Sequence, residues 1–233
     1  MDSGSNQRDV IPNTYNPDMM WGPSEFDARH IVVINYLYQI PLFRGQNSLA
    51  AKALGGWQIS GITQFQAGLP CSVVGPNTDY AGIGPSDANF GCGANGEYWA
   101  VNGVPKIIGT FGPNGQWFST TNPDGSPIFI KPTAGTFTNA RVRDIIYQPG
   151  FQNWNMGLFK TFAFNEKRGL QFRAEAYNVW NHPNWCANSG CNGQTNIGLD
   201  PTNLKTFGKV LTKGSGSSGQ GERNLQLSLR FYF

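Results

Sequence analysis

Residues suited to acid–base chemistry are few and scattered along the chain. Among the 233 residues, the two histidines are His30 and His182, and neither lies in a recognisable catalytic motif. Arg173 and Glu175 are two residues apart in a segment with strand periodicity, so they share a face and favour an ion pair over an acid and base pair. The sequence contains no nucleophile elbow, zinc-protease motif or phosphate-binding loop. We therefore expect a protein that is not an enzyme.

Two short segments match cofactor or metal motifs only in part. Residues 214–219, Gly-Ser-Gly-Ser-Ser-Gly, fit the dinucleotide pattern, but no apolar strand leads into them and no helix follows. A flexible external loop is the better interpretation. Residues 122–126, Asn-Pro-Asp-Gly-Ser, offer oxygen ligands for calcium in part, but as a turn they need no metal. We expect no cofactor and no metal.

Four cysteines lie among glycine and asparagine residues: Cys71, Cys92, Cys186 and Cys191. The spacing of Cys186 and Cys191 lacks the paired pattern and the histidine partners of a zinc site. Loop disulfides in an oxidising compartment fit this pattern better. We expect Cys186 to pair with Cys191, and Cys71 to pair with Cys92.

Composition argues against several classes of protein. Charged residues make up 13% of the chain, about half the usual share, and the chain has 30 glycines and 15 prolines. The formal net charge of +3 is too small and too dispersed to favour nucleic acid. The sequence has no apolar run long enough for a membrane-spanning helix, and its first residues lack the apolar core of a signal peptide. For an exported protein, we expect the signal peptide to lie upstream of Met1.

Five segments have strand periodicity. Apolar and polar residues alternate most strictly in residues 223–233, where one face carries Leu225, Leu227, Leu229, Phe231 and Phe233. The other segments with alternation are residues 30–41, 56–67, 151–164 and 170–181. Their polar faces carry mainly Gln, Asn, Ser, Thr and Tyr, which suits a wet interior better than an open surface. A half-buried strand of a soluble sandwich is the alternative for residues 223–233.

The connections between these segments alternate in length. Residues 165–169 form a tight turn and residues 42–55 a modest link, whereas residues 68–150 and 182–222 are long. Outer-membrane barrels combine short periplasmic turns with long external loops, and a periplasmic C-terminus places both long segments outside. We therefore predict an all-β fold, an antiparallel transmembrane β-barrel segment with long external loops in the cell outer membrane.

Aromatic residues have two expected roles. Six aromatic residues near strand ends fit an interfacial girdle: Trp57, Trp154, Trp180, Trp185, Tyr232 and Phe233. The alternative is that these residues are ordinary core aromatics. The long segment 68–150 contains candidate ligand-binding aromatics among flexible glycine and asparagine: Tyr80, Trp99, Trp117 and Phe118. Short strands within this segment fit residues 106–108, 116–118 and 127–131.

Residues 55–68, 150–160 and 170–184, together with the terminal Phe233, resemble the C-terminal end of TonB-dependent outer-membrane receptors of the Oar-like type. Such receptors often carry a carboxypeptidase-regulatory-like domain at the N-terminus. The resemblance covers nearly the whole chain, residues 1–233. It implies that the five strands are the final ones of a barrel of about 22 strands. It also implies that the N-terminal plug and the TonB-contacting segment are absent from this sequence.

The resemblance implies energised uptake of an unknown ligand by the parent protein. Its expected partners are outer-membrane lipid, the TonB system through the missing N-terminal part, and the barrel-assembly machinery, which would read Leu225, Leu227, Leu229, Phe231 and Phe233. Five strands cannot close a barrel, so the fragment alone is not expected to transport anything. One alternative is a secreted carbohydrate-binding or adhesive β-domain, in which Tyr80, Trp99 and Trp117 would stack on sugars. An outer-membrane enzyme is another.

Overall fold

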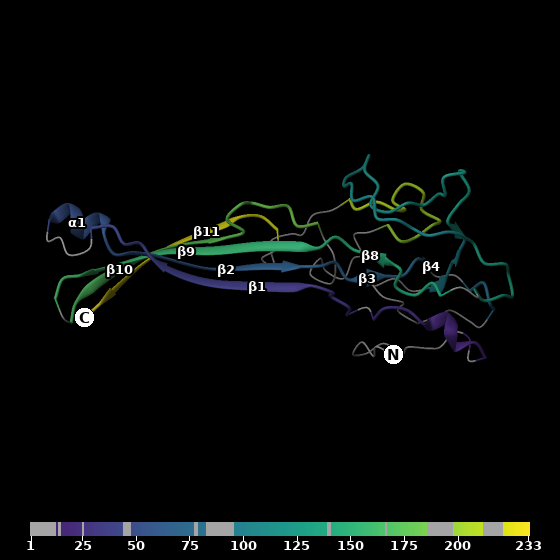
Figure 1. Cartoon of the computed structure of the whole chain (residues 1–233), viewed down its shortest axis with the longest axis horizontal. Helices are drawn as coiled ribbons and strands as arrows, with labels where there is room; N and C mark the ends of the chain where they lie inside the picture. The colour runs from purple at the N-terminus through teal and green to yellow at the C-terminus, as the bar shows by residue number, and fades with distance from the viewer. Residues whose placement is uncertain are drawn as a thin grey trace. The chain divides into compact units, whose positions relative to one another are not determined.

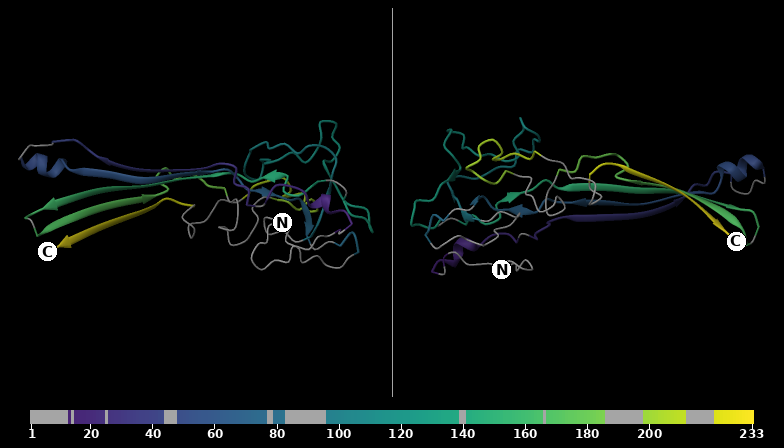
Figure 2. Two further views of the ribbon diagram at one scale, coloured as in Figure 1. Left: turned by 60° about the horizontal axis from the view of Figure 1, so that its bottom comes forward. Right: turned by 180° about the vertical axis from the view of Figure 1, so that it is seen from behind.

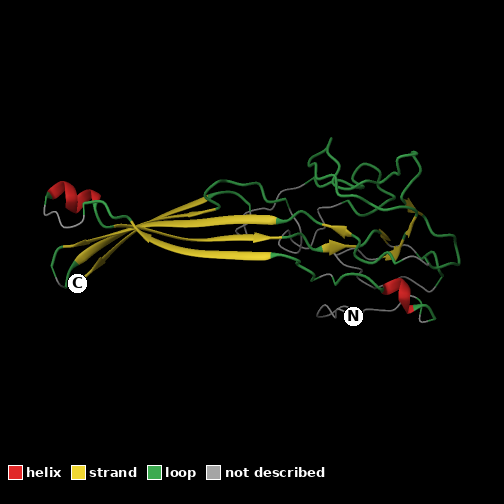
Figure 3. Cartoon of the chain, in the orientation of Figure 1, coloured by secondary structure: helices red, strands yellow, loops and turns green. Residues whose placement is uncertain are grey.

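The computed structural model describes residues 13, 15–24, 26–43, 48–76, 79–82, 96–138, 141–165, 167–185, 198–211 and 221–233. Two compact units make up the chain. Unit 1 contains residues 1–29, 67–151 and 185–214, and unit 2 contains residues 30–66, 152–184 and 215–233. Long strands form most of unit 2, whereas unit 1 consists mainly of loops with short strands (Figure 3). The described helices are the 3-10 helix η1 (Pro17–Met20) and α1 (Leu49–Leu54).

The described part of the chain includes no helix that is long and apolar enough to span a membrane.

Unit 2 is built on one antiparallel sheet of five strands (Figure 1). In spatial order the strands are β1 (Ile31–Gln39), β2 (Trp57–Gln66), β9 (Phe151–Ala163), β10 (Gly169–Tyr177) and β11 (Asn224–Tyr232). The register places Phe172 of β10 opposite Lys160 of β9 and Leu229 of β11. Chain order and spatial order agree, so every connection joins neighbouring strands, and β1 and β11 form the two edges.

Helix α1 lies in the link between β1 and β2. Its sequence, Leu-Ala-Ala-Lys-Ala-Leu, consists of strong helix formers. Ser48 caps its first turn, because the Ser48 hydroxyl accepts a hydrogen bond of 3.1 Å from the Ala51 N–H. Gly55 ends the helix. The sequence had indicated only a modest link for this segment.

Strand β10 ends at Tyr177 rather than at residue 181, because the next residue leaves the extended conformation. Asn178 has a φ of 50° and a fully buried side chain. Its amide oxygen accepts from the His182 N–H at 2.9 Å, and its amide nitrogen donates to the carbonyls of His182 at 2.9 Å and Gly221 at 2.7 Å. The Asn178 N–H donates to Asn155 of β9 at 3.1 Å. One asparagine therefore joins β9, β10 and the segment that enters β11.

Two further asparagines extend this corner. The Asn181 side chain accepts from the Arg223 N–H, just before β11, at 3.1 Å. The Asn184 side chain accepts from the Gln152 N–H of β9, also at 3.1 Å. Residues 178–184, which we call the asparagine corner, therefore fix the ends of three neighbouring strands. Asparagine suits this role because it tolerates positive φ and carries both a donor and an acceptor.

Unit 1 contains three small antiparallel sheets. Their strand pairs are β3 (Pro70–Cys71) with β8 (Ile146–Tyr147), β4 (Val74–Pro76) with β5 (Gly96–Tyr98), and β6 (Ala100–Val101) with β7 (Phe129–Ile130). One hydrophobic core connects the unit, and its buried residues are Cys71, Val73, Trp117, Phe118, Ile128, Phe129, Ile146, Leu199 and Val210. Leu199 and Val210 come from the second long segment. The two segments predicted as separate external loops thus share one core.

The asparagine corner predicts a stability defect for Asn178→Ala. The change leaves buried backbone groups of His182 and Gly221 without their partners and places alanine at positive φ, so we expect a loss of about 3 kcal/mol. Denaturant titration of the native protein in detergent measures this loss. Asn178→Gly relieves the backbone strain and should recover about 1 kcal/mol of it. If Asn178→Gly were as stable as the native protein, the side-chain hydrogen bonds would contribute nothing.

Candidate functional site: the two faces of the five-stranded sheet

Alternation along the five strands of unit 2 gives the sheet two chemically different faces. Cross-strand pairs such as Leu229 with Phe172, and Leu227 with Ala174, put the apolar positions of neighbouring strands on one face. We call this the apolar face, and its main members are Val32, Ile34, Trp57, Ile59, Phe65, Trp154, Met156, Leu158, Phe162, Leu170, Phe172, Leu225, Leu227, Leu229 and Phe231. Leu225 and Leu227 are more than two-thirds exposed, so no protein group covers them.

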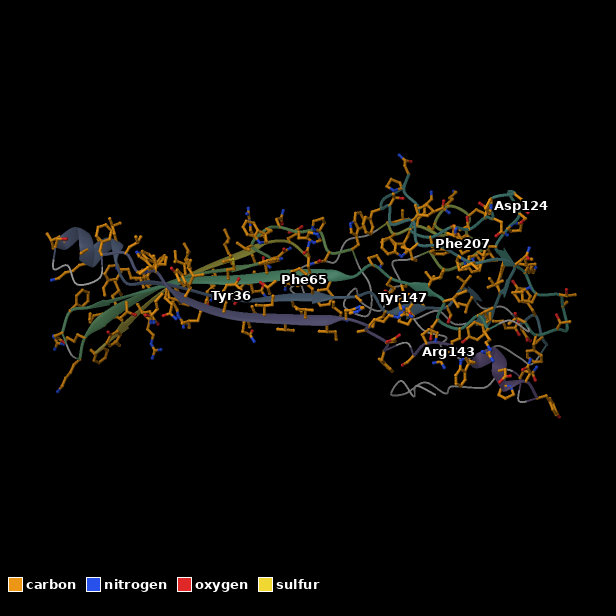
Figure 4. The ribbon with its side chains drawn as sticks, in the orientation of Figure 1. Tyr36, Phe65, Asp124, Arg143, Tyr147 and Phe207 are labelled. Carbon is orange, nitrogen blue, oxygen red and sulfur yellow. The ribbon has the colours of Figure 1, made fainter. Side chains whose placement is uncertain are left out.

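Aromatic side chains gather at both ends of the apolar face. At the end that leads into the long connections, Trp154 contacts Phe65 edge to face at 5.7 Å between ring centroids, and Trp180 at 6.4 Å (Phe65 is labelled in Figure 4). The other end holds the β9–β10 turn, α1 and Phe233, and we call it the short-turn end. There Trp57 contacts Phe172 at 5.9 Å and Phe231 stacks on Phe233 at 6.0 Å. Between the two aromatic bands the side chains are smaller, except for Tyr36 of β1 opposite Gly61.

The separation of the two bands fits a bilayer. Trp57 and Phe65 are eight residues apart on β2. At the rise of a strand this is about 26 Å along the chain, and a tilt of about 40° reduces it to about 20 Å across the membrane. Membrane barrels have an apolar band of about 25 Å between aromatic girdles. The apolar face therefore has the height and the flanking residues of a lipid-facing surface.

Lys160 of β9 is the one charged residue that the described strands place on the apolar face. It is buried, and its ammonium group donates a hydrogen bond to the Gly55 carbonyl at the end of α1. The ammonium nitrogen lies 4.9 Å from the ring centroid of Phe162 and 5.6 Å from that of Trp57. The sequence pattern did not single out Lys160. The available signal was that Lys160 occupies a position at which the alternation of β9 calls for an apolar residue, between Leu158 and Phe162.

The opposite face, which we call the polar face, carries mainly amides and hydroxyls. Its polar members include Asn35, Gln58, Ser60, Gln64, Asn155, Gln171, Arg173, Glu175, Gln226, Ser228 and Arg230. The expected ion pair between Arg173 and Glu175 does not form. The Arg173 guanidinium instead lies over the ring of Phe159 at 5.0 Å. Arg173 prefers this ring because Phe159 is directly opposite it on β9.

The polar face also has an aliphatic strip that the sequence pattern did not predict. Its members are Ile31, Val33, Leu37 and Ile62, and each is at least half exposed. Ile62 of β2 lies opposite Asn35, which places it diagonally between Val33 and Leu37 of β1. Strand β1 is thus apolar on both faces. Its apolar residues at positions 31, 33 and 37, out of phase with the alternation, were the available signal.

The four candidate ligand-binding aromatics of unit 1 have different surroundings. Phe118 is fully buried in the core, and Trp117 is 9% exposed, with its indole N–H donating to the Tyr147 carbonyl at 2.7 Å. Both rings are packed inside the unit and offer little surface to a ligand. Trp99 packs partly buried against the same core. Tyr80 is partly exposed, and the Lys131 ammonium lies 5.1 Å from its ring centroid.

The Tyr80 backbone is held by a buried carboxylate. Glu97 accepts hydrogen bonds from the N–H groups of Tyr80 and Ala81. The loop is therefore fixed without involving the tyrosine ring. A ligand-binding role for Tyr80 stays a prediction.

Titratable groups of unit 1 have structural partners. Burial raises the pKa of the Tyr147 phenol, and the Arg29 guanidinium, 4.4 Å from its ring centroid, opposes this shift. Hydrogen bonds from Ser126 lower the pKa of Asp124, as expected of a simple turn in residues 122–126. Within the described residues no cluster of three or more His, Cys, Asp or Glu could hold a metal ion. Figure 4 labels Tyr147 and Asp124.

The cysteine predictions reach beyond the described residues. Cys71 is buried and disulfide-bonded. Cys92, Cys186 and Cys191 lie outside the described residues, as do residues 214–219, so both predicted pairings stay predictions.

Comparison with known families decides between a soluble and a membrane sheet. The model of the outer membrane beta barrel domain matches residues 1–226. The chain belongs to this family. No curated protein and no solved structure matches the chain significantly. Membership confirms the predicted antiparallel all-β fold and the outer-membrane location. Strands of such barrels turn apolar residues to lipid and polar residues to the lumen, so we assign the apolar face to lipid and the polar face to the lumen.

The two faces predict opposite effects for neighbouring substitutions on β11. Leu227→Arg places a charge at mid-depth in lipid and should lower the free energy of unfolding by about 2 to 4 kcal/mol. Gln226→Arg faces the lumen opposite Glu175 and should change stability by less than about 1 kcal/mol. Denaturant titration of both variants in lipid or detergent compares them directly. A greater loss for Gln226→Arg would show that the faces are assigned the wrong way round.

Proposed function

We propose that the chain is the C-terminal part of a TonB-dependent receptor that takes up a scarce or bulky ligand across the outer membrane. The resemblance of residues 170–184 and the terminal aromatic strand to Oar-like receptors supports this proposal. Family membership agrees with it at a coarser level. In this proposal the five strands of unit 2 are the final strands of a larger barrel, and a plug and a TonB-contacting segment precede them. No catalytic step is part of it.

The observation that carries the proposal is the aliphatic strip on the lumen-facing surface. Val33 and Leu37 are 51% and 65% exposed, and Ile62 between them is 51% exposed. A water-filled channel would leave these side chains in contact with water, and because each is already about half buried, the cost is about 1 kcal/mol for each one, roughly half the value for a fully exposed side chain. A lumen filled by a folded plug would bury them. The strip therefore favours a plugged transporter over an open pore.

The secreted carbohydrate-binding alternative has less support. It required Trp117 as an exposed platform, but this ring lies in the core of unit 1 and stacks on Phe111 at 5.1 Å. The proposed partners are the TonB system and the barrel-assembly machinery, which would recognise the edge strand β11 with its terminal Phe233. In this proposal the loops of unit 1 would select the ligand.

A gene deletion tests uptake in cells. Deleting the native gene should abolish growth on one class of limiting nutrient from a panel of metal chelates, oligosaccharides and peptides. Restoring the gene should rescue growth only in cells that keep an energised TonB system, because uptake against a gradient needs that energy. Rescue without TonB would show a passive pore. Unchanged growth of the deletion strain across the panel would count against an uptake role.

Val33→Asp tests the plugged lumen separately. The new carboxylate would face the plug across the aliphatic strip, weaken its seating and raise sensitivity to vancomycin, a large antibiotic that intact outer membranes exclude. Gln64→Asp is the matched control, because Gln64 is the cross-strand partner of Val33 on the same face but is already polar. The minimum inhibitory concentration should fall several-fold for Val33→Asp alone. Equal values for both variants would mean that nothing apolar covers the strip.

A further inference from the structure

The short-turn end of unit 2 exposes apolar side chains beyond the ends of the strands. Leu42 and Phe43 follow β1, Leu49 and Leu54 belong to α1, and Phe164 follows β9. Each is exposed by more than a third, and Leu49 by 85%. These residues lie outside the strand segments that span the lipid, where water-exposed turns are normally polar. We therefore infer that this end of the sheet contacts an apolar environment in addition to the lipid around the strands.

Cationic side chains lie among these apolar residues. Lys52 of α1 and Lys167 and Arg168 of the β9–β10 turn are all exposed. The acidic residues that the structure describes in unit 2, Glu175 and Glu222, belong to the other half of the sheet. In the sequence the two connections also contain Arg44 and Glu166, whose charges offset each other. The short-turn end is therefore positively charged.

Lys160 holds α1 against the apolar face. Its ammonium group donates to the carbonyl of Gly55, the residue that ends the helix, where a cation stabilises the free carbonyls of the last turn. Gly55 itself has no room for a side chain, because an added Cβ would lie 2.7 Å from the Ala51 carbonyl oxygen and 2.9 Å from that of Leu42. The helix is thus fixed beside the aromatic band, with Leu49 and Leu54 exposed. Both views in Figure 2 show α1 and the C-terminus at this same end.

We propose that the short-turn end binds the headgroups of anionic phospholipids, with α1 lying in the membrane interface. Exposed leucines beside lysines are the composition of an interfacial helix, whose apolar side chains enter the acyl boundary while the cations meet lipid phosphates. The aromatic band of Trp57 and Phe172 is continuous with this surface, which favours lipid over an acidic protein partner. The inference is independent of ligand uptake and depends only on the outer-membrane location.

Lipid titration of the native protein tests the proposal. Native mass spectrometry in detergent would compare the binding of phosphatidylglycerol and phosphatidylcholine that have the same acyl chains. We expect tighter binding of phosphatidylglycerol, and we expect the preference to shrink at about 0.5 M salt because the contacts are electrostatic. The triple variant Lys52→Gln, Lys167→Gln and Arg168→Gln should lose at least tenfold in affinity for phosphatidylglycerol, since each surface cation contributes about fivefold. Its affinity for phosphatidylcholine should not change.

Two control variants separate charge from apolar contact. Arg230→Gln removes a cation near the same end but on the lumen-facing surface, so the lipid preference should persist. Leu49→Ser should weaken binding of both lipids equally. Heat modifiability on gels verifies that each variant is folded. Equal affinity of the native protein for both lipids, or an unchanged preference in the triple variant, would overturn the proposal.

Discussion

Every backbone N–H and C=O group inside a bilayer must be paired, because lipid offers no hydrogen-bonding partner. In unit 2 this condition is met on both sides of β2, β9 and β10, and on one side of β1 and β11. The sheet can therefore reside in the membrane only with both edges joined to further strands. The same constraint explains the sharp corner after β10, where Asn178 supplies hydrogen bonds to backbone groups that leave the ladder. The pairing of the inner strands and the hydrogen-bonded corner after β10 both meet this requirement.

Local patterns predicted the strands well, because alternation is a property of neighbouring residues. The terminal strand is the clearest example, with Leu225 to Phe231 on one face in the sequence and in the structure alike. The end of β10 was not predictable in this way. Asn178 ends the strand through contacts with Asn155, His182 and Gly221, and two of these residues are more than 20 positions away in sequence. The shared core of unit 1 was missed for the same reason, since Val210 and Phe118 are distant in the chain.

Side-chain type alone also misassigned some residues. An aromatic residue in a glycine-rich segment fits a binding surface and a small core equally well, and only burial separates the two, as with Phe118. On β1 the alternating residues Val32 and Ile34 drew attention to one face, although Val33 and Leu37 make the other face apolar too. Val33 and Leu37 are more than half exposed, so lipid on the apolar face would still leave the other face of β1 uncovered. In the proposed receptor, a plug would cover that face.

The lipid-facing surface is not symmetric between its two ends. Both ends carry aromatic rings, as a bilayer with two similar interfaces demands, but only the short-turn end adds Lys52, Lys167 and Arg168. Aromatic bands alone fix the depth of the sheet but would allow either end to face either leaflet. The cations make the short-turn end chemically different from the other end, because phosphate headgroups attract cations while the acyl region excludes them. Lys160 combines a cation with the aromatic band, because its ammonium group lies near the rings of Trp57 and Phe162. A cation at the apolar face needs a hydrogen-bond acceptor, and the Gly55 carbonyl accepts the hydrogen bond from Lys160.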